Sequence, residues 1–412
     1  MNKQTLTLLT VVVLLLGGVY LISGGAGRAR TDGSLGAVLE SVDAEKIAKI
    51  VIDQSDKTID LELHNGHWTL ANRSNYPANP SKVRSLLLKL LDLSASQRIP
   101  ASEQGIKKLG LSEEALALGR ARVRLLDANG KELEGLFLGD TRKTKGEPGM
   151  SPMAAVAGSG QYVRKTSGGD VFLVGLPVTV SSEVSNWLDA LILNVLQKDV
   201  LEVEQFSLAN EEKRQLFSVA NEGGAAVSLV GGVPEGKKVQ DSLVSQIASG
   251  LENFSMIDVV ASADASVSAL IYDYLTEFST SGGVVYEVYT AKKDGKYFAK
   301  VQARFDEELV QMIKQDAEVA QKEAEAATTA AEDKADDPNA AKTEKSEKKE
   351  PTLSSAEAVA EQNKSFAEWI YVLAEFQAEK FRHQRDDLIQ EEAKEDAAEV
   401  GRQAISEVES EG

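Results

Sequence analysis

The sequence predicts an α+β protein with an N-terminal transmembrane helix followed by two tandem related units of antiparallel hairpins with packed helices. Three observations lead to this prediction. The chain opens with a nearly unbroken apolar run. Its body alternates between the period-two spacing of strands and the longer spacing of amphipathic helices. The same order of elements then recurs in the second half.

The composition narrows the class of protein. The 412 residues suffice for two or three domains, and a hydrophobic content of 42% supports a buried core. The formal net charge of −19 would repel nucleic acid, so we expect no nucleic-acid partner. The chain has no cysteine, which excludes disulfides, thiolate metal sites, cysteine nucleophiles and a lipidated cysteine. Absence of thiols suits an oxidising envelope compartment.

The N-terminal segment 1–27 is predicted to be a transmembrane anchor. Leu6 to Ile22 is apolar on all faces and approaches the length that crosses a bilayer. A cleaved signal peptide is the alternative, because Ser23 to Ala29 offers small residues for cleavage. We favour the anchor, since the run is long for a signal peptide. The expected location is the inner (cytoplasmic) membrane, single-pass, with the body in the periplasm.

The first unit is expected over residues 43–198, after a linker at 28–42. Asn65-Gly66 between alternating apolar residues predicts a β-hairpin. A leucine-rich helix follows, with Ser81 as its expected N-cap. A second hairpin turns near Gly130, and strands follow at 162–163 and 171–174. A closing helix is predicted to open at Ser181-Ser182 and to carry the apolar residues Val184, Trp187, Leu188, Leu191 and Ile192.

The second unit is expected over residues 199–392. Val203, Phe206 and Leu208 repeat the spacing of Ile47, Ile50 and Ile52, which indicates a duplication, although chance apolar matching is the rival explanation. In the same comparison of the two halves, the turn at Lys293 to Gly295 aligns with the turn that ends at Gly130.

A charged, alanine-rich insertion at about 310–362 interrupts this unit and predicts solvated helix. After it, Trp369–Leu373 is predicted to be a strand and Phe376–Ile389 the closing helix. The alternative is a partner-docking amphipathic helix with the stripe Phe366, Trp369, Leu373 and Phe376. An acidic tail occupies 393–412.

The sequence resembles the DUF4340 family of bacterial envelope proteins, over about residues 40–392. The resemblance lies in the short N-terminal apolar anchor and in short segments of the body, namely Ile47–Ile52, His64–Leu70, Pro77–Val83, Leu109–Leu111, Leu138–Asp140 and Val171–Val174. The family has no established mechanism, and some members are encoded near ABC transporters of the gliding-motility type. The resemblance therefore implies an accessory role in the envelope and supplies no catalytic residues.

No catalytic, cofactor-binding or metal-binding residues are predicted. The only histidines are His64, His67 and His383, and two imidazoles at one turn make a poor zinc site. Nucleophile-elbow and phosphate-loop motifs are absent. Several further residues are expected to be structural rather than functional: a mobile basic loop at Arg142, Lys143 and Lys145, turn glycines at Gly223-Gly224 and Gly231-Gly232, and core tryptophans at Trp68, Trp187 and Trp369.

The leading functional prediction is a non-catalytic, membrane-anchored envelope accessory or scaffold protein, auxiliary to an ABC-type transporter complex. Its expected partners are the membrane, through the N-terminal helix, and envelope or transporter proteins. One alternative is a binding module for a small envelope ligand or glycan, held in a cleft between the repeats. Another is a hydrolase whose site carries no motif that we identify.

Overall fold

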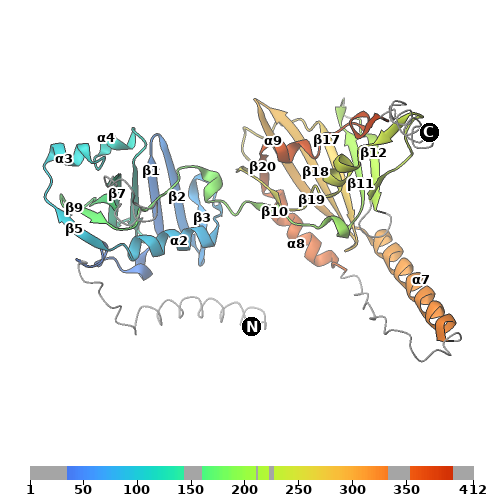
Figure 1. Ribbon diagram of the computed structural model, residues 1–412, viewed down its shortest axis with the longest axis horizontal. Coiled ribbons are helices and arrows are strands. Elements are labelled where there is room, and N and C mark those ends of the chain that lie inside the picture. The colour runs from blue at the N-terminus through green and yellow to red at the C-terminus, as the bar shows by residue number, and fades with distance from the viewer. Residues whose placement is uncertain (1–34, 143–159, 210–211, 222–226, 333–352, 393–412) are drawn as a thin grey trace, which may run out of the picture. The chain divides into compact units, whose positions relative to one another are not determined.

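The computed structural model describes residues 35–142, 160–209, 212–221, 227–332 and 353–392. The chain divides into two compact units, Met1–Ala190 and Leu191–Gly412, called unit 1 and unit 2 below. Both are mixed α/β, with mostly antiparallel sheets and few helices (Figure 1). This confirms the mixed, antiparallel class that the sequence predicts.

Unit 1 is built on a nine-stranded antiparallel sheet in the order β4-β3-β2-β1-β6-β7-β8-β9-β5. Its strands are β1 (Lys49–Gln54), β2 (Lys57–His64), β3 (His67–Leu70), β4 (Tyr76–Pro77), β5 (Ala95–Ile99), β6 (Ala121–Leu126), β7 (Glu132–Arg142), β8 (Gly160–Lys165) and β9 (Val171–Val174). Its helical segments are η1 (Ala44–Lys46), η2 (Ala71–Arg73), α2 (Pro80–Leu91), α3 (Glu103–Lys108), α4 (Glu113–Leu116) and η3 (Val184–Asn186).

The β2–β3 hairpin is confirmed, and its turn explains its sequence. Asn65 and Gly66 have φ of 51° and 83°, the left-handed conformation that both central positions of a type I′ turn need. Asparagine and glycine are the residues that adopt it at least cost. His64 and His67 consequently face each other across the pair of strands.

Helix α2 is confirmed, but its expected N-cap is wrong. Asn79 caps the helix, because its side chain accepts a hydrogen bond from the Lys82 amide at 3.1 Å. Pro80 then occupies the first turn, where a missing N–H costs nothing, and Ser81 lies inside the helix. The helix buries Val83, Leu86 and Leu90.

The predicted closing helix from Ser181 is also wrong. Only the short η3 forms. The backbone around and after it makes hydrogen bonds to segments elsewhere in unit 1 instead of continuing the hydrogen bonds of a helix. The Asn79 amide donates to the Trp187 carbonyl at 2.7 Å, and the Asp189 amide donates to the Pro77 carbonyl at 3.1 Å. Because these backbone groups are taken by tertiary partners, the apolar spacing here does not become a helix.

The described part of the predicted linker, from Leu35 onward, belongs to the fold of unit 1. The Leu35 amide donates to the Ala95 carbonyl at 2.8 Å, and the Val38 amide donates to the Leu93 carbonyl at 2.7 Å. Val38 and Leu39 are buried. The glycine-rich composition therefore does not mark the whole of 28–42 as a linker.

Unit 2 is built on an eight-stranded antiparallel sheet in the order β13-β12-β11-β17-β18-β19-β20-β16. The strands of this sheet are β11 (Val200–Ser207), β12 (Arg214–Asn221), β13 (Val227–Leu229), β16 (Asp258–Ala261), β17 (Tyr274–Thr280), β18 (Val284–Lys293), β19 (Lys296–Phe305) and β20 (Trp369–Leu373). Two small pairs join β10 (Leu191–Leu193) to β15 (Phe254–Ser255) and β14 (Lys237–Val239) to β21 (Ile389–Glu391). The helical segments are η4 (Gln197–Asp199), α6 (Asp241–Ala248), α7 (Glu307–Glu332), α8 (Ala356–Ala367), α9 (Glu375–Glu379) and η6 (Arg385–Leu388).

Between β19 and β20 the charged insertion contributes α7 and α8. Helix α8 lies along β19 and buries Val359 and Phe366, and its Asn363 side chain accepts a hydrogen bond from the Ala303 amide at 3.1 Å. Trp369–Leu373 is the strand β20, as predicted, and all of its residues are buried between β16 and β19.

The closing helix predicted over Phe376–Ile389 is wrong beyond its first turn. It is replaced by the short α9, by η6 and by β21. The alternative docking stripe does not form either, because Phe366, Trp369 and Leu373 are buried and only Phe376 is exposed.

Within the described ranges, no helix combines the length and the apolar character that a bilayer crossing requires. The predicted anchor at 1–27 lies outside those ranges, as does the acidic tail at 393–412.

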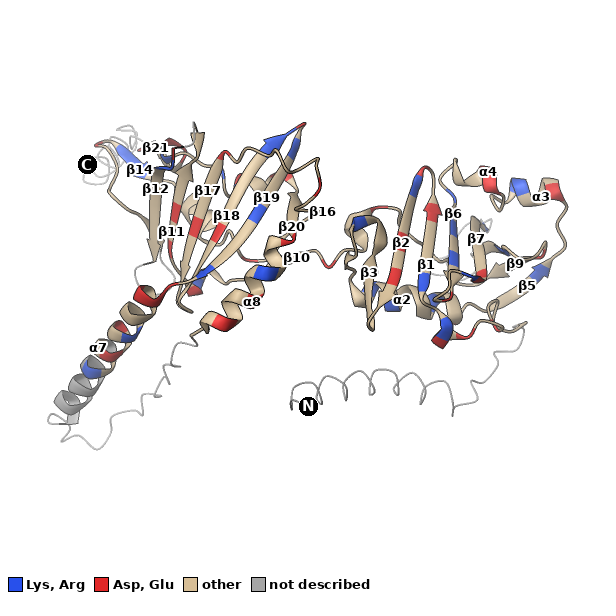
Figure 2. Ribbon diagram, turned by 180° about the vertical axis from the view of Figure 1, so that it is seen from behind, with Lys and Arg blue, Asp and Glu red and all other residues tan. Residues whose placement is uncertain are grey.

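One face of the unit 2 sheet carries a row of carboxylates on β11, β17 and β18 (Figure 2). Glu204 pairs directly with Glu277 in the ladder, and Glu277 pairs with Glu287. Lys213 binds Glu277, and Arg304 lies 3.8 Å from Glu287. Burial, followed by the nearby Glu202 and Glu277, raises the pKa of Glu204 above its ordinary value.

Replacing Glu204 with glutamine is expected to stabilise unit 2 at neutral pH. A carboxyl whose pKa is raised by folding costs stability once it ionises, and below the ordinary carboxyl range that cost disappears. We expect a gain of about 0.5–1 kcal/mol at pH 8 and no gain at pH 4, the size of a relieved cross-strand repulsion. Urea unfolding of the variant and of Glu235→Gln, an exposed control, measures the difference. A gain that is equal at both pH values would contradict this origin.

Candidate functional site

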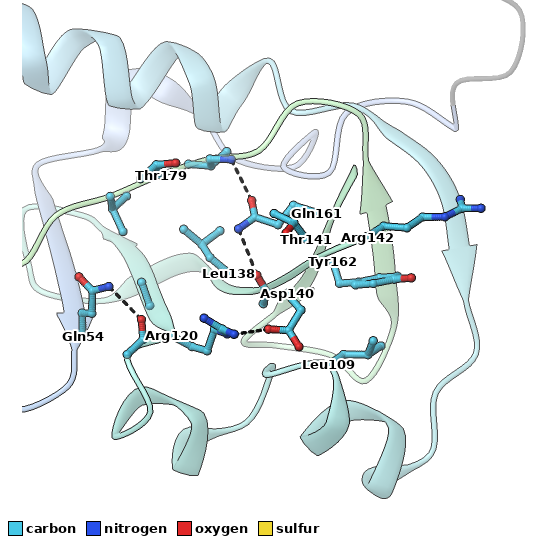
Figure 3. A pocket seen from close by; sticks show the side chains of 15 residues that line it. Gln54, Leu109, Arg120, Leu138, Asp140, Thr141, Arg142, Gln161, Tyr162 and Thr179 are labelled. Carbon is cyan, nitrogen blue, oxygen red and sulfur yellow. Dashed lines mark hydrogen bonds and ion pairs between the residues drawn. The ribbon is translucent and has the colours of Figure 1, made fainter. Parts of the chain in front are cut away.

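A pocket of about 770 Å³ lies at one end of the unit 1 sheet (Figure 3). It is formed where β1, β7 and β8 meet the turn before β6 and the segment after β9. The lining residues are Gln54, Leu109, Gly119, Arg120, Ala121, Leu138, Gly139, Asp140, Thr141, Arg142, Gln161, Tyr162, Val178, Thr179 and Val180. A volume of this size is typical of small-molecule sites.

An irregularity in β7 shapes the floor of the pocket. The β7–β8 register shifts between Leu138 and Thr141, so Gly139 and Asp140 form a β-bulge. A Cβ at Gly139 would lie 2.3 Å from the Leu109 carbonyl oxygen. Glycine is thus required for this close approach, in which the Asp140 amide donates to Leu109 at 2.9 Å.

Gln161 is the buried polar side chain that fixes the walls. Its side chain is only 7% exposed. Its Nε2 donates to the Gly139 carbonyl at 3.3 Å, and its Oε1 accepts from the Val178 amide at 2.8 Å (Figure 3). One amide therefore ties the bulge to the segment that forms the opposite wall.

The charged groups of the pocket give it a cationic excess. Arg120 forms an ion pair with Asp140, and both side chains remain more than one-third exposed. Arg142 also lines the pocket, at the end of β7, and its guanidinium points away from Arg120 and Asp140 (Figure 3). Nearby, Gln54 donates to the Gly119 carbonyl at 2.9 Å and holds the turn that presents Arg120. Because arginine can bind a carboxylate through two parallel hydrogen bonds, this arrangement suits recognition of a small polar or anionic group.

Replacing Gln161 with leucine is expected to lower the free energy of unfolding of unit 1 by about 2 kcal/mol, because the buried Val178 amide loses its acceptor. Urea unfolding in a Trp369→Phe background reports on unit 1 through Trp68 and Trp187. Gln104→Leu, at an exposed position on α3, is the matched control and should change stability little. A loss of less than 0.5 kcal/mol for Gln161→Leu would contradict the bracing role (typical exposed substitutions lie within about that range).

The three histidines that the sequence singles out do not form one site: His64 and His67 are paired across the β2–β3 hairpin, and His383 lies in unit 2. His64 and His67 are exposed at their hairpin, and His64 Nε2 lies 3.2 Å from Glu62 Oε2. His383 is in unit 2, where burial lowers its pKa. No group of three or more potential metal ligands occurs within the described part of the chain.

Of the predicted basic loop, Arg142 lines the pocket, and Lys143 and Lys145 lie outside the described residues. Gly231 and Gly232 have φ of 88° and 68°, as turn glycines do, and Gly223-Gly224 is not described. Trp187 and Trp369 are buried and Trp68 is partly buried.

Sequence reasoning missed Arg120, Asp140 and Gln161 as site residues. Leu138-Gly-Asp140 is a visible signal, because a glycine and a charged residue interrupt an apolar strand. Gln161 gives no signal, since its role depends on Val178 and Gly139, which only the folded sheet brings beside it.

Comparison with known proteins adds one match. The model of the family described as "Domain of unknown function (DUF4340)" matches residues 68–270, about half of the chain, and this range includes most of the pocket. No curated protein and no solved structure matches the chain. Pro77–Val83, Leu109–Leu111, Leu138–Asp140 and Val171–Val174 lie within the matched range, whereas Ile47–Ile52 precedes it. The chain is a DUF4340 domain-containing protein.

Proposed function

We propose that units 1 and 2 are two copies of one α+β unit. The strand order supports this. In unit 1 the sheet runs β3-β2-β1-β6-β7-β8-β9-β5 inside its β4 edge, and in unit 2 it runs β13-β12-β11-β17-β18-β19-β20-β16. Along the chain, each unit begins with a three-strand meander, continues with a helix and the strand at the far edge of the sheet, and ends with four further strands. A coincidence of this length between unrelated sheets is improbable.

The hydrogen bonds outside the sheets support the same relationship. The residue before α2, Asn79, donates its amide to the Trp187 carbonyl at 2.7 Å. The residue before α6, Gln240, donates its amide to the Leu388 carbonyl at 2.8 Å. In both units the closing segment is therefore tied to the start of the central helix.

This correspondence also revises the sequence alignment of the two halves. The turn Lys293-Asp294-Gly295 joins β18 to β19 and so matches the connection between β7 and β8. The sequence match had set it against the β6–β7 turn, one strand too early. The insertion that contains α7 and α8 takes the place of the short β8–β9 connection.

For function, we propose a membrane-anchored accessory or scaffold protein of the bacterial envelope, auxiliary to an ABC-type transporter complex. The observation that carries this proposal is the apolar run Leu6–Ile22 ahead of a body made of two sheet units. No enzymatic step is needed for such a role.

Protease accessibility and crosslinking test this role. In spheroplasts, added protease should degrade the body, and intact cells should protect it. Crosslinked membranes should yield envelope or transporter proteins with the chain. A variant lacking residues 1–27 should lose both the membrane association and these partners. Protection of the body in spheroplasts, or recovery of cytoplasmic proteins alone, would overturn the proposal.

The second candidate function is binding of a small ligand, and the pocket within unit 1 is the observation that favours it. The pocket has the size of a ligand site, and its walls are fixed by the buried Gln161. Such bracing holds polar groups in place before a ligand arrives, which lowers the cost of binding.

A further inference from the structure

The two units differ at the position of the unit 1 pocket. The registers define the matching positions. Gln54, at the end of β1, pairs with Ala121, and Ser207, at the end of β11, pairs with Tyr274. Ala121 of unit 1 therefore corresponds to Tyr274 of unit 2.

The same reasoning extends across the sheet. Thr141 pairs with Gln161 at the start of β8, and Lys292 pairs with Tyr297 at the start of β19. Gln161 thus corresponds to Tyr297. The two tyrosines of unit 2 occupy positions that line the pocket in unit 1.

In unit 2 the position that corresponds to the pocket is occupied by a side chain of the protein, that of Arg382. The Arg382 guanidinium lies 4.9 Å from the centre of the Tyr274 ring and 5.6 Å from that of Tyr297. It also binds Asp273, with Nη2 to Oδ2 at 3.2 Å. Tyr297 is held in turn by Lys292 and Glu375, at 2.8 and 2.9 Å from its hydroxyl. Stacking on aromatic rings and pairing with a carboxylate both stabilise the guanidinium of Arg382 at this position.

Unit 1 has the smaller Ala121 and Gln161 at the two tyrosine positions, and there the space is an open pocket. The residue just before β6 also has the opposite charge to the residue just before β17. Asp273, which binds the guanidinium, precedes β17, and Arg120 precedes β6. Unit 2 uses the carboxylate of Asp273 to hold its own cation, whereas unit 1 places Arg120 at the pocket, where it pairs with Asp140.

We infer that the pocket of unit 1 binds a carboxylate-bearing small molecule or peptide end, and that unit 2 is the closed copy in which Arg382 takes the ligand's place. The carboxylate binds N–H donors of the Arg120 guanidinium beside those that pair with Asp140, because a guanidinium carries five such donors. Thr141 and Thr179 line the same pocket and have hydroxyls that can donate hydrogen bonds. This inference deepens the binding role proposed above and rests on it.

Calorimetry on the full-length chain in detergent micelles tests the inference. The probes are N-acetyl-trialanine with a free C-terminal carboxylate and the same peptide with a C-terminal amide. They differ only in the charged group. The free acid is expected to bind about tenfold more tightly than the amide or better, which is the effect of one charge-assisted bidentate contact.

Two variants and a control locate the binding. Arg120→Gln should abolish the preference for the acid, and Ala121→Tyr should block both peptides by rebuilding the tyrosine of unit 2. Arg84→Gln, at an exposed arginine on α2 outside the pocket, should bind as the natural chain does. Circular dichroism verifies that each variant folds. If Ala121→Tyr does not fold, Arg120→Gln decides, because Arg120 is 44% exposed and its loss leaves the core intact.

Equal affinity for acid and amide, undiminished binding by Arg120→Gln or by a folded Ala121→Tyr, or no binding of the acid at millimolar concentration would each overturn the inference. These outcomes leave the anchored accessory role to be judged separately, by the protease and crosslinking experiments.

Discussion

Replacing Phe381 with alanine is expected to lower the free energy of unfolding of unit 2 by about 4 kcal/mol. Phe381 is fully buried, and its ring packs edge-on against Phe254 and Phe278, with ring centres 4.9 and 6.0 Å apart. The change removes this burial and leaves a cavity that the surrounding sheet cannot collapse to fill, a combination that costs about 3–5 kcal/mol. The aromatic pairs add to the burial term.

Urea unfolding measures this loss when Trp68 and Trp187 are replaced by phenylalanine. Trp369, in β20, is then the only tryptophan and reports on unit 2. Phe376→Ala is the matched control, because Phe376 lies in the same segment and is 63% exposed. Its stability should change by less than about 0.5 kcal/mol. Equal effects of the two substitutions would show that Phe381 is not a core residue.

Replacing Arg382 with alanine is expected to destabilise unit 2 by about 3 kcal/mol. The side chain is only 20% exposed and combines stacking on Tyr274 and Tyr297 with the ion pair to Asp273. Desolvated cation–π contacts contribute about 2 kcal/mol. Loss of the guanidinium also leaves Asp273 without its cation and removes the stacked group from both rings. The partly exposed carboxylate limits the ion-pair share.

The Trp369 background again provides the measurement. Arg382→Lys separates the terms, since lysine keeps the charge but cannot stack as a planar group, and it should recover part of the loss. Arg214→Ala, at an exposed position on β12, is the control for loss of an arginine. A change below 1 kcal/mol for Arg382→Ala would remove the argument that Arg382 fills unit 2 as a built-in occupant (surface ion pairs alone contribute about 0–1 kcal/mol).

Local chemistry explains which parts of the fold could be predicted. The hairpin at Asn65-Gly66 was predictable because a type I′ turn requires a positive φ at both central positions, and asparagine and glycine adopt it at low cost. The strand Trp369–Leu373 was predictable because its apolar residues form a short, continuous run. The cap of α2 was missed by two residues, since both Asn79 and Ser81 can cap and only the position of Pro80 distinguishes them.

The two closing helices failed for a different reason. Residues 184–192 and 376–389 have helical apolar spacing, yet in both segments the backbone pairs with the chain near the start of a distant helix. Apolar spacing indicates which side chains can be buried on one face. It does not indicate which backbone groups will be near enough to form hydrogen bonds once the sheet has formed.

The sequence by itself determined the class of fold and the hairpin at Asn65-Gly66, because these depend on local turn chemistry and on the period of apolar residues. The family followed from a resemblance of short segments. Only the tertiary structure decided where the pocket lies. Gln161, Arg120 and Val178 are far apart along the chain, and their meeting depends on strand register and on the bulge at Gly139. Under the duplication proposed above, Tyr274, Tyr297 and Arg382 of unit 2 occupy the positions that correspond to the pocket of unit 1.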